Sequence, residues 1–139
     1  MPDRTTTRRG FLTALGALFG TLALDVWPAA GSSVTRRPVH PDPRPDIDGS
    51  RVLTAEQVGP RLAELYDGVR TIPAVVDGIG CHCGCAEVPG MYSLLSCYEE
   101  SGMAQYCDIC QGEGRLVARL HREGRTLDEI RAEIDRQFG

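Results

Sequence analysis

The stretch Cys-His-Cys-Gly-Cys at residues 81–85 brings three thiols into five consecutive positions, with Gly80 before it and Gly84 inside it. A disulfide between cysteines two positions apart is disfavoured, because the bond requires a particular Cα separation and dihedral angle. Glycines let the chain turn tightly, so the three sulfur atoms can converge on one point instead. Grouped thiolates suit Cu(I), Zn(II) or another thiophilic ion, whereas Mg²⁺ and Ca²⁺ prefer oxygen ligands. The stretch therefore predicts a chelating loop.

The other three cysteines follow closely, so that all six lie within residues 81–110. Cys107 and Cys110 form a Cys-x-x-Cys pair at or just inside the start of a predicted helix. The free amides and the dipole there favour thiolate, so we expect a lowered thiol pKa. This spacing suits a redox pair, a disulfide or two metal ligands, while Gln111 in place of histidine argues against covalent haem attachment. Three hypotheses stay open: a soft-metal site, a thiol redox site, or three structural disulfides.

The three histidines differ in how well they could serve the cysteine loop. His82 lies between two cysteines, and in an extended loop its side chain points away from theirs, so it is a weaker candidate ligand than any cysteine. His121 falls about 16 Å beyond Cys110 along the same helix and cannot share an ion with it. We expect His121 to be a polar residue near the helix carboxyl end, and His40, in a proline-rich segment, to be solvated.

Composition narrows the function further. The chain has 139 residues, a net charge of −4, and 15 basic residues that are all arginine. This length permits one small domain, whose apolar core is lean enough to need a cross-link. An acidic balance argues against nucleic acid as a partner. The sequence has no Ser-His-Asp set and no glycine-rich phosphate loop, so neither hydrolase nor nucleotide chemistry is indicated.

Capping residues and helical periodicity predict an all-α domain, a small bundle of four or five short helices around the cysteine loop. A Thr-x-x-Gln capping box at Thr54 begins a helix over about 55–67, which Gly68 ends. One or two further turns follow at 72–76, with a proline in the first turn. No segment shows the alternation of a strand.

The second half of the chain carries three more predicted helical segments. A short helix covers about 91–100. A longer one covers 105–123, although Gly112 and Gly114 each weaken its middle by about 1 kcal/mol relative to alanine. A second capping box, at Thr126, begins the last helix.

The first 31 residues have the order of an export signal: an arginine pair, an uncharged apolar segment over 11–24, and small residues at the end. The apolar segment is shorter than a membrane-spanning helix requires. Arg8 and Arg9, followed by Gly-Phe-Leu, resemble the twin-arginine signal, whose pathway carries proteins already folded and often loaded with a metal or cofactor. We therefore predict a signal peptide at 1–31, a proline-rich linker at 32–51 and a Cys-rich helical domain at 52–139.

This organisation predicts a periplasmic or extracytoplasmic location. No cysteine precedes Cys81, so we do not expect an acyl-anchored lipoprotein. Contact with the membrane would come only through an uncleaved signal segment.

The cysteine region resembles the PCYCGC-motif (CYCXC) family of exported bacterial proteins, some members of which carry selenocysteine near the motif. The similarity covers about the last 70 residues and includes Ile-Pro-Ala-Val-Val at 72–76, the cysteine triplet, Leu-Leu-Ser-Cys-Tyr at 94–98 and Cys-Asp-Ile-Cys at 107–110. Gly80 and His82 stand where the motif has Pro and Tyr. Selenium in some members implies a nucleophilic or soft-metal role rather than disulfides as staples.

The carboxyl third is also similar to the small helical thiol-oxidoreductase domain of the cytochrome c maturation apparatus. The similar segments are the Cys-x-x-Cys-Gln at 107–111, Gly-Arg-Thr-Leu-Asp-Glu-Ile at 124–130 and the terminal Gln-Phe-Gly. The cysteine triplet has no counterpart there. This resemblance implies thiol–disulfide exchange at Cys107 and Cys110.

Taken together, the residues favour a protein that binds Cu(I) or Zn(II) and handles the metal outside the cytoplasm, and an enzyme only if it is a thiol–disulfide oxidoreductase. Its partners would be the metal ion and another exported protein that carries a thiol or a metal. The candidate ligands are Cys81, Cys83, Cys85, Cys97, Cys107 and Cys110, with His82 as a further candidate. The alternatives are exchange chemistry at the Cys-x-x-Cys pair and a non-catalytic interaction domain held by disulfides.

Overall fold

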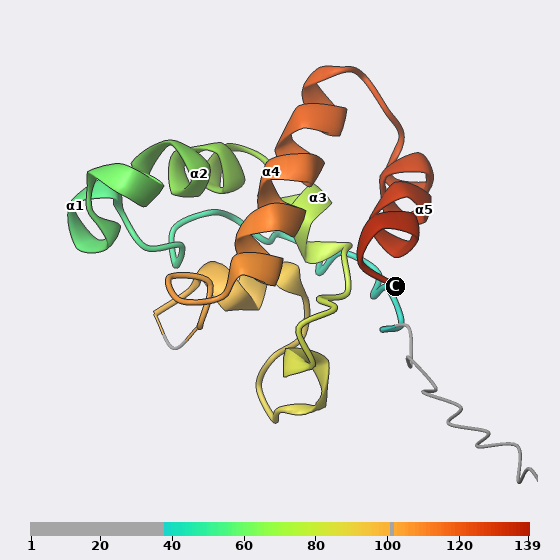
Figure 1. Cartoon of the computed structure of the whole chain (residues 1–139), viewed down its shortest axis with the longest axis horizontal. Coiled ribbons are helices and arrows are strands. Elements are labelled where there is room, and N and C mark those ends of the chain that lie inside the picture. Colours follow the sequence, from blue (N-terminus) through green and yellow to red (C-terminus); the bar gives the residue numbers. More distant parts are fainter. Residues whose placement is uncertain (1–37, 101) are drawn as a thin grey trace, which may run out of the picture. The chain divides into compact units, whose positions relative to one another are not determined.

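The computed structural model describes residues 38–100 and 102–139, and these residues confirm the predicted all-α class (Figure 1). The only β pairing among them is an isolated bridge between Val52 and Glu99. The predicted signal segment lies outside the described residues. None of the described helices combines the length and apolar character that a membrane crossing requires. The elements, in chain order, are α1 (Ala55–Val58), α2 (Pro60–Thr71), α3 (Pro73–Asp77), the 3₁₀ helices η1 (Cys85–Glu87) and η2 (Leu94–Tyr98), α4 (Asp108–Arg122) and α5 (Leu127–Phe138).

The predicted helix over 55–67 is two helices. The capping box at Thr54 forms, with Gln57 accepting the Thr54 backbone N–H at 2.7 Å. Gly59, at φ 78°, then ends α1, and Pro60 begins α2 because its fixed φ suits a first helical position. Gly68 does not stop the helix but lies inside α2. Packing of the buried face of α2 outweighs the weak helix propensity of this glycine.

Two other predicted boundaries also change. The segment predicted as a helix over 91–100 forms only the 3₁₀ helix η2, whose five residues are all buried. The long helix begins at Asp108 rather than at 105, with Cys107 as its N-cap. The last helix begins at the predicted capping box, where Thr126 and Glu129 bond reciprocally.

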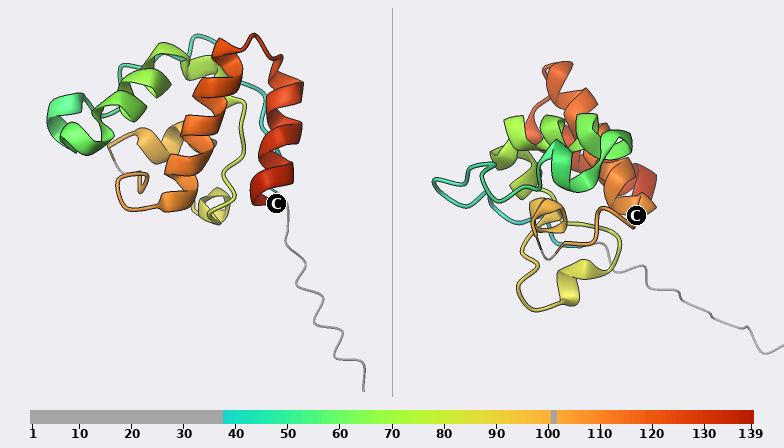
Figure 2. Two further views of the ribbon diagram at one scale, coloured as in Figure 1. Left: turned by 45° about the horizontal axis from the view of Figure 1, so that its top comes forward. Right: turned by 90° about the vertical axis from the view of Figure 1, so that its left-hand side faces the viewer.

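Helix α4 lies at the centre of the domain and packs against α2, α3, α5 and η2 (Figure 2). The contact with η2 is made at Gly114, where an added Cβ would overlap the Tyr98 hydroxyl. That hydroxyl donates to the backbone carbonyl of Cys110 at 2.6 Å, and the Tyr98 ring meets Tyr66 edge-on at 4.9 Å. Gly114 therefore permits a close approach that fixes the start of α4 against η2.

Residues 38–50, part of the predicted linker, lie against the helical body. Asp77 at the end of α3 is fully buried and binds Arg44, with the Arg44 guanidinium 2.7 Å from Asp77 Oδ1. The Arg44 backbone N–H and the Ser93 hydroxyl also donate to this carboxylate, at 2.8 and 2.6 Å. From α5, Arg131 donates to the backbone carbonyls of Gly78 and Pro41. Charged side chains thus fasten this segment beside the cysteine loop.

We expect Asp77→Ala to lower the free energy of unfolding by about 2–3 kcal/mol, because the Arg44 and Ser93 donors lose the buried carboxylate that accepts their hydrogen bonds. Asp48→Ala is the matched control: Asp48 is exposed and bonds only Ser50 nearby, so its loss should change stability by about 0.5 kcal/mol or less. Urea unfolding followed by circular dichroism at pH 7 measures both changes.

The effect of Asp77 should also depend on pH. Burial opposes ionisation of Asp77, but the hydrogen bonds from Arg44 and Ser93 outweigh it and hold the pKa below its ordinary value. A lowered carboxyl pKa stabilises the fold above the unfolded value of about 3.9, and this contribution is lost as the pH falls through the folded-state pKa. Wild type and Asp77→Ala should therefore converge in stability under strongly acidic conditions, and a constant difference down to pH 2 would contradict this account.

Candidate metal centre

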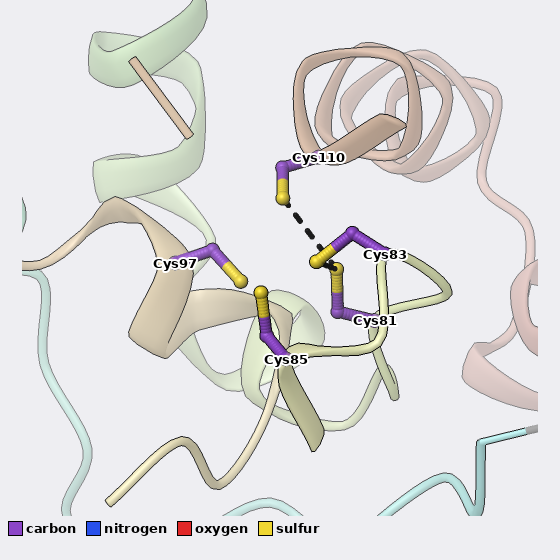
Figure 3. A group of neighbouring side chains, drawn as sticks. All are labelled: Cys81, Cys83, Cys85, Cys97 and Cys110. Atoms are coloured by element: carbon purple, nitrogen blue, oxygen red, sulfur yellow. Dashed lines mark hydrogen bonds between the residues drawn. The ribbon is translucent and has the colours of Figure 1, made fainter. Parts of the chain in front are cut away.

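Five cysteine sulfur atoms gather at one point inside the domain (Figure 3). Every Sγ of this group, here called the thiol cluster, lies within 4.8 Å of every other. The cysteines come from the 81–85 loop, from η2 and from the first turn of α4. Four of the five residues are buried, and all six cysteines of the chain carry free thiols. The members of the thiol cluster are Cys81, Cys83, Cys85, Cys97 and Cys110.

The loop folds back on itself as its glycines predict. Gly84 has φ 86°, a left-handed conformation that other residues rarely adopt, and Cys85 then begins η1. Gly80 serves a different purpose, because an added Cβ there would lie 2.8 Å from the carbonyl oxygen of Val39. The resulting loop brings Cys81 Sγ to 3.1 Å from Cys83 Sγ. The predicted convergence of the triplet is thus present in the structure.

Two other elements complete the thiol cluster. Cys97 is fully buried in η2, and its backbone carbonyl accepts the Ala104 N–H at 2.9 Å. Cys110 is fully buried in the first turn of α4, with its Sγ 3.6 Å from that of Cys81. Cys107 lies outside the five-sulfur group. As the N-cap of α4 it directs its Sγ to the backbone N–H of Cys110 at 3.4 Å.

Most thiols of the cluster are poor acids without a cation. Burial, followed by the hydrogen bond and charge of Cys83, raises the pKa of Cys85 to about 11. The hydrogen bond with Cys81 favours the Cys110 thiolate, but the bond to Cys97, burial and the charge of Cys97 outweigh it and raise the Cys110 pKa well above its ordinary value. The lowered pKa expected for Cys110 from the helix dipole is therefore wrong. A metal cation must displace these protons to bind.

Cys83 behaves differently from its neighbours. Burial opposes its ionisation, but hydrogen bonds from the Cys85 and Cys81 thiols and from the Cys85 backbone outweigh burial and lower the pKa of Cys83. Cys83 is also the one partly exposed member of the thiol cluster. It is consequently the thiol of the cluster most ready to meet an incoming ion.

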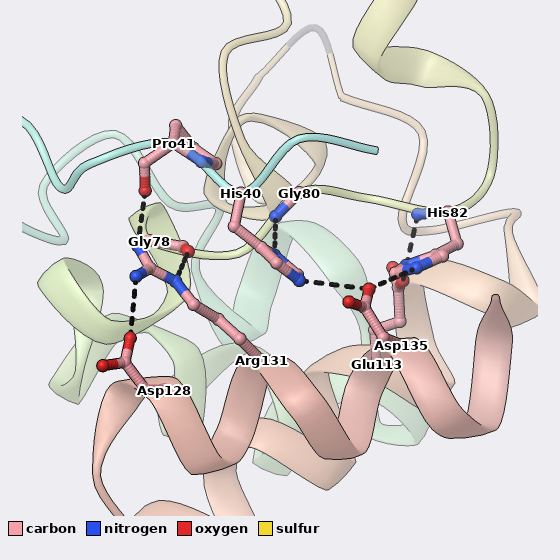
Figure 4. Close-up of polar contacts among 9 residues, drawn as sticks. All are labelled: His40, Pro41, Gly78, Gly80, His82, Glu113, Asp128, Arg131 and Asp135. Atoms are coloured by element: carbon pink, nitrogen blue, oxygen red, sulfur yellow. Dashed lines mark hydrogen bonds and ion pairs between the residues drawn. The ribbon is translucent and has the colours of Figure 1, made fainter. Parts of the chain in front are cut away.

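The side chain of His82 extends toward carboxylates of α4 and α5 (Figure 4). Its Nδ1 lies 2.7 Å from Glu113 Oε1 and its Nε2 lies 3.1 Å from Asp135 Oδ1. The His82 backbone N–H donates to the same Glu113 oxygen at 3.0 Å. Both ring nitrogens are occupied by carboxylates, so His82 fastens the loop to α4 and α5 instead of facing the thiol cluster.

The other two histidines lie in different environments, one mostly buried and one exposed. The expectation of a solvated His40 is wrong: its side chain is 14% exposed, its Nε2 lies 3.1 Å from Asp135 Oδ1, and its Nδ1 accepts the Gly80 N–H at 3.0 Å. Burial lowers the pKa of His40 despite the opposing charge of Asp135. His121 is exposed in the last turn of α4, at the helix end where the sequence places it.

Sequence reasoning missed two residues near the centre. Glu113 is fully buried on α4, where it shares a face with Cys110, Val117 and Leu120 at helical spacing, and a charged residue on an apolar stripe is a usable signal. Met103, in the loop before α4, places its Sδ 2.8 Å from Cys85 Sγ. A single methionine in a loop gives no comparable signal.

We expect Cys83 and Cys107 to be alkylated first in the reduced, metal-free protein, because they alone among the six cysteines are partly exposed. Loading with a soft metal ion should protect Cys83 and leave Cys107 reactive. Timed reaction with iodoacetamide at pH 7, followed by mass spectrometry, measures both rates. Protection of Cys107 together with Cys83 would contradict the placement of Cys107 outside the thiol cluster.

This donor set can hold a soft metal ion. Structural Zn(II) takes four ligands in a tetrahedron, so five sulfurs would leave one spare around a single Zn(II). Thiolates also suit Cu(I). Comparison of the chain with protein-family models, with curated proteins and with solved structures found no match. The function is therefore argued from the chemistry of the thiol cluster itself.

Proposed function

We propose that this chain is an exported metal-handling protein that binds Cu(I) or Zn(II) through its thiol cluster. The observation that carries the proposal is the convergence of five cysteine sulfur atoms within 4.8 Å. Five is an odd number, so disulfides within the cluster would leave one thiol unpaired.

The amino-terminal resemblance supports a place outside the cytoplasm. A twin-arginine signal would deliver the domain already folded, which suits a centre whose ligands come from three separated elements and must be assembled before the metal binds. The resemblance to the PCYCGC-motif family, whose members are exported, also supports a location outside the cytoplasm. The protein would pass its metal to, or receive it from, an exported partner with a thiol or metal site.

A second candidate function is thiol–disulfide exchange at Cys107 and Cys110. The observation that favours it is the position of Cys107: it is the partly exposed N-cap of α4, so a disulfide of another protein can reach its sulfur. Its partner Cys110 is buried in the thiol cluster, so exchange would break up the proposed metal centre. The two functions therefore compete for Cys110.

Anaerobic titration of the reduced protein tests the proposal. Cu(I) and Zn(II) are added separately, each against a chromophoric chelator of known affinity, and proton release is recorded. We expect at least one ion to bind with nanomolar affinity or tighter and to release protons from the thiol cluster. Binding no tighter than micromolar for both ions would overturn the proposal, and catalysed reduction of a test disulfide by metal-free protein would favour the second candidate.

A further inference from the structure

A sixth sulfur atom touches the thiol cluster. The Sδ of Met103 lies 2.8 Å from the Sγ of Cys85. Met103 is nevertheless 47% exposed, whereas Cys85 is buried, so the methionine lies at the boundary between the cluster and solvent. A thioether in this position is the first soft donor that an ion arriving from that side would meet.

The loop that carries Met103 is fixed to the backbone of a cluster residue. Ala104, the next residue, donates its N–H to the carbonyl oxygen of Cys97 at 2.9 Å. Gly102, the preceding residue, lies so close to the Cys97 backbone that an added Cβ would overlap its carbonyl group. The Gly102 N–H donates to the Glu99 backbone carbonyl at 2.8 Å, and the Met103 carbonyl accepts the Tyr106 N–H at 2.9 Å. These contacts hold the methionine beside Cys85.

A thioether and a thiolate contribute differently to a buried centre. Each thiolate adds a negative charge that its neighbours oppose, and each must lose a proton before it binds. A thioether is neutral, so it adds a soft donor without charge and without a proton to displace. Thioethers suit Cu(I), whereas the usual Zn(II) ligands are cysteine, histidine and carboxylate groups.

We propose that Met103 is a ligand of the metal centre, beside Cys85 on its solvent side, and that it makes the centre prefer Cu(I) to Zn(II). This inference rests on the proposed function, since it assumes that the thiol cluster binds metal. It adds to that function a sixth donor and the identity of the preferred ion.

Met103→Leu tests the inference, because leucine keeps the apolar volume and removes the sulfur. Met91→Leu is the matched control, since Met91 undergoes the same change and packs against the core. We expect Met103→Leu to weaken Cu(I) binding about 10-fold or more and to leave Zn(II) binding unchanged. Loss of a residue that only supports a metal ligand already lowers metal affinity about 10–100-fold. Met91→Leu should change neither. Unchanged Zn(II) binding also shows that Met103→Leu still folds.

A direct structural readout uses selenomethionine in place of every methionine. X-ray absorption at the selenium edge of the Cu(I)-loaded protein should show a copper neighbour in wild type and in Met91→Leu, and none in Met103→Leu. Bound Cu(I) with no selenium–copper contact in wild type would overturn the role of Met103 alone. A wild type that binds Zn(II) but not Cu(I) would also overturn only this inference, whereas a wild type that binds neither ion would overturn the proposed function as well.

Discussion

Replacing both Cys81 and Cys110 with serine is expected to weaken Zn(II) binding by about 100-fold or more, because the three sulfurs left in the thiol cluster are fewer than the four that Zn(II) takes. Loss of a residue that merely supports a metal ligand already lowers affinity 10–100-fold, and loss of a ligand should reach at least the upper limit. Both residues are buried and their Sγ atoms lie 3.6 Å apart, so no water-exposed group can replace them. Serine keeps nearly the same volume and removes only the soft donor.

Cys107→Ser is the matched control for this prediction. Cys107 lies three residues before Cys110 at the same end of α4 and undergoes the same chemical change, but its sulfur is outside the thiol cluster. Chelator competition on both variants, with far-ultraviolet circular dichroism to verify folding, gives the comparison. Equal losses of affinity in the two variants, or no loss in the double variant, would contradict the assignment of ligands.

Gly114→Ala should lower the free energy of unfolding by about 3 kcal/mol, at the upper end of the usual range for overpacking. The added Cβ would overlap the Tyr98 hydroxyl and lie 2.8 Å from Tyr98 Cζ. Tyr98 has no room to retreat, because its ring is fully buried against Tyr66 and its hydroxyl is bonded to the Cys110 carbonyl. The clash outweighs the advantage of about 1 kcal/mol that alanine has over glycine inside a helix.

Gly68→Ala is the control, and we expect it to raise stability rather than lower it. Gly68 also lies inside a helix, but the nearest atom to an added Cβ is the Ala118 Cβ at 3.9 Å, an ordinary contact. This substitution should raise stability by about 0.5–1 kcal/mol, since only helix propensity changes. Urea unfolding measures the stability of both variants. A similar loss of stability in the two would contradict the claim that Tyr98 leaves no room for a side chain at Gly114.

The fold could be predicted where local signals decide it. The two capping boxes and the first-turn proline of α3 place three helix starts correctly, because each depends on residues within one turn. The 3₁₀ helix η2 was not distinguishable from an α-helix, since both give apolar residues at similar spacing. The close approach at Gly114 and the ion pair between Arg44 and Asp77 join residues far apart in the sequence, which no local signal reveals.

In the candidate site, too, the features set by neighbouring residues could be predicted, and those set by distant residues could not. Convergence of Cys81, Cys83 and Cys85 followed from their spacing and from Gly84. The exclusion of Cys107 depends on a helix that begins at Asp108 rather than 105, which turns this cysteine from a helical position into an N-cap. The raised pKa of Cys110 depends on burial among other thiols, which overrides the helix dipole.

Metal and thiol content of the protein from its native compartment tests the central claim most directly. The protein would be purified without reductant and without chelator, its metals measured by elemental analysis, and its thiols counted before and after a chelator is added. The account predicts bound Cu(I) or Zn(II), one reactive thiol at first, that of Cys107, and the five thiols of the cluster as well once the metal is removed. Metal-free protein whose six cysteines form three stable disulfides would contradict it.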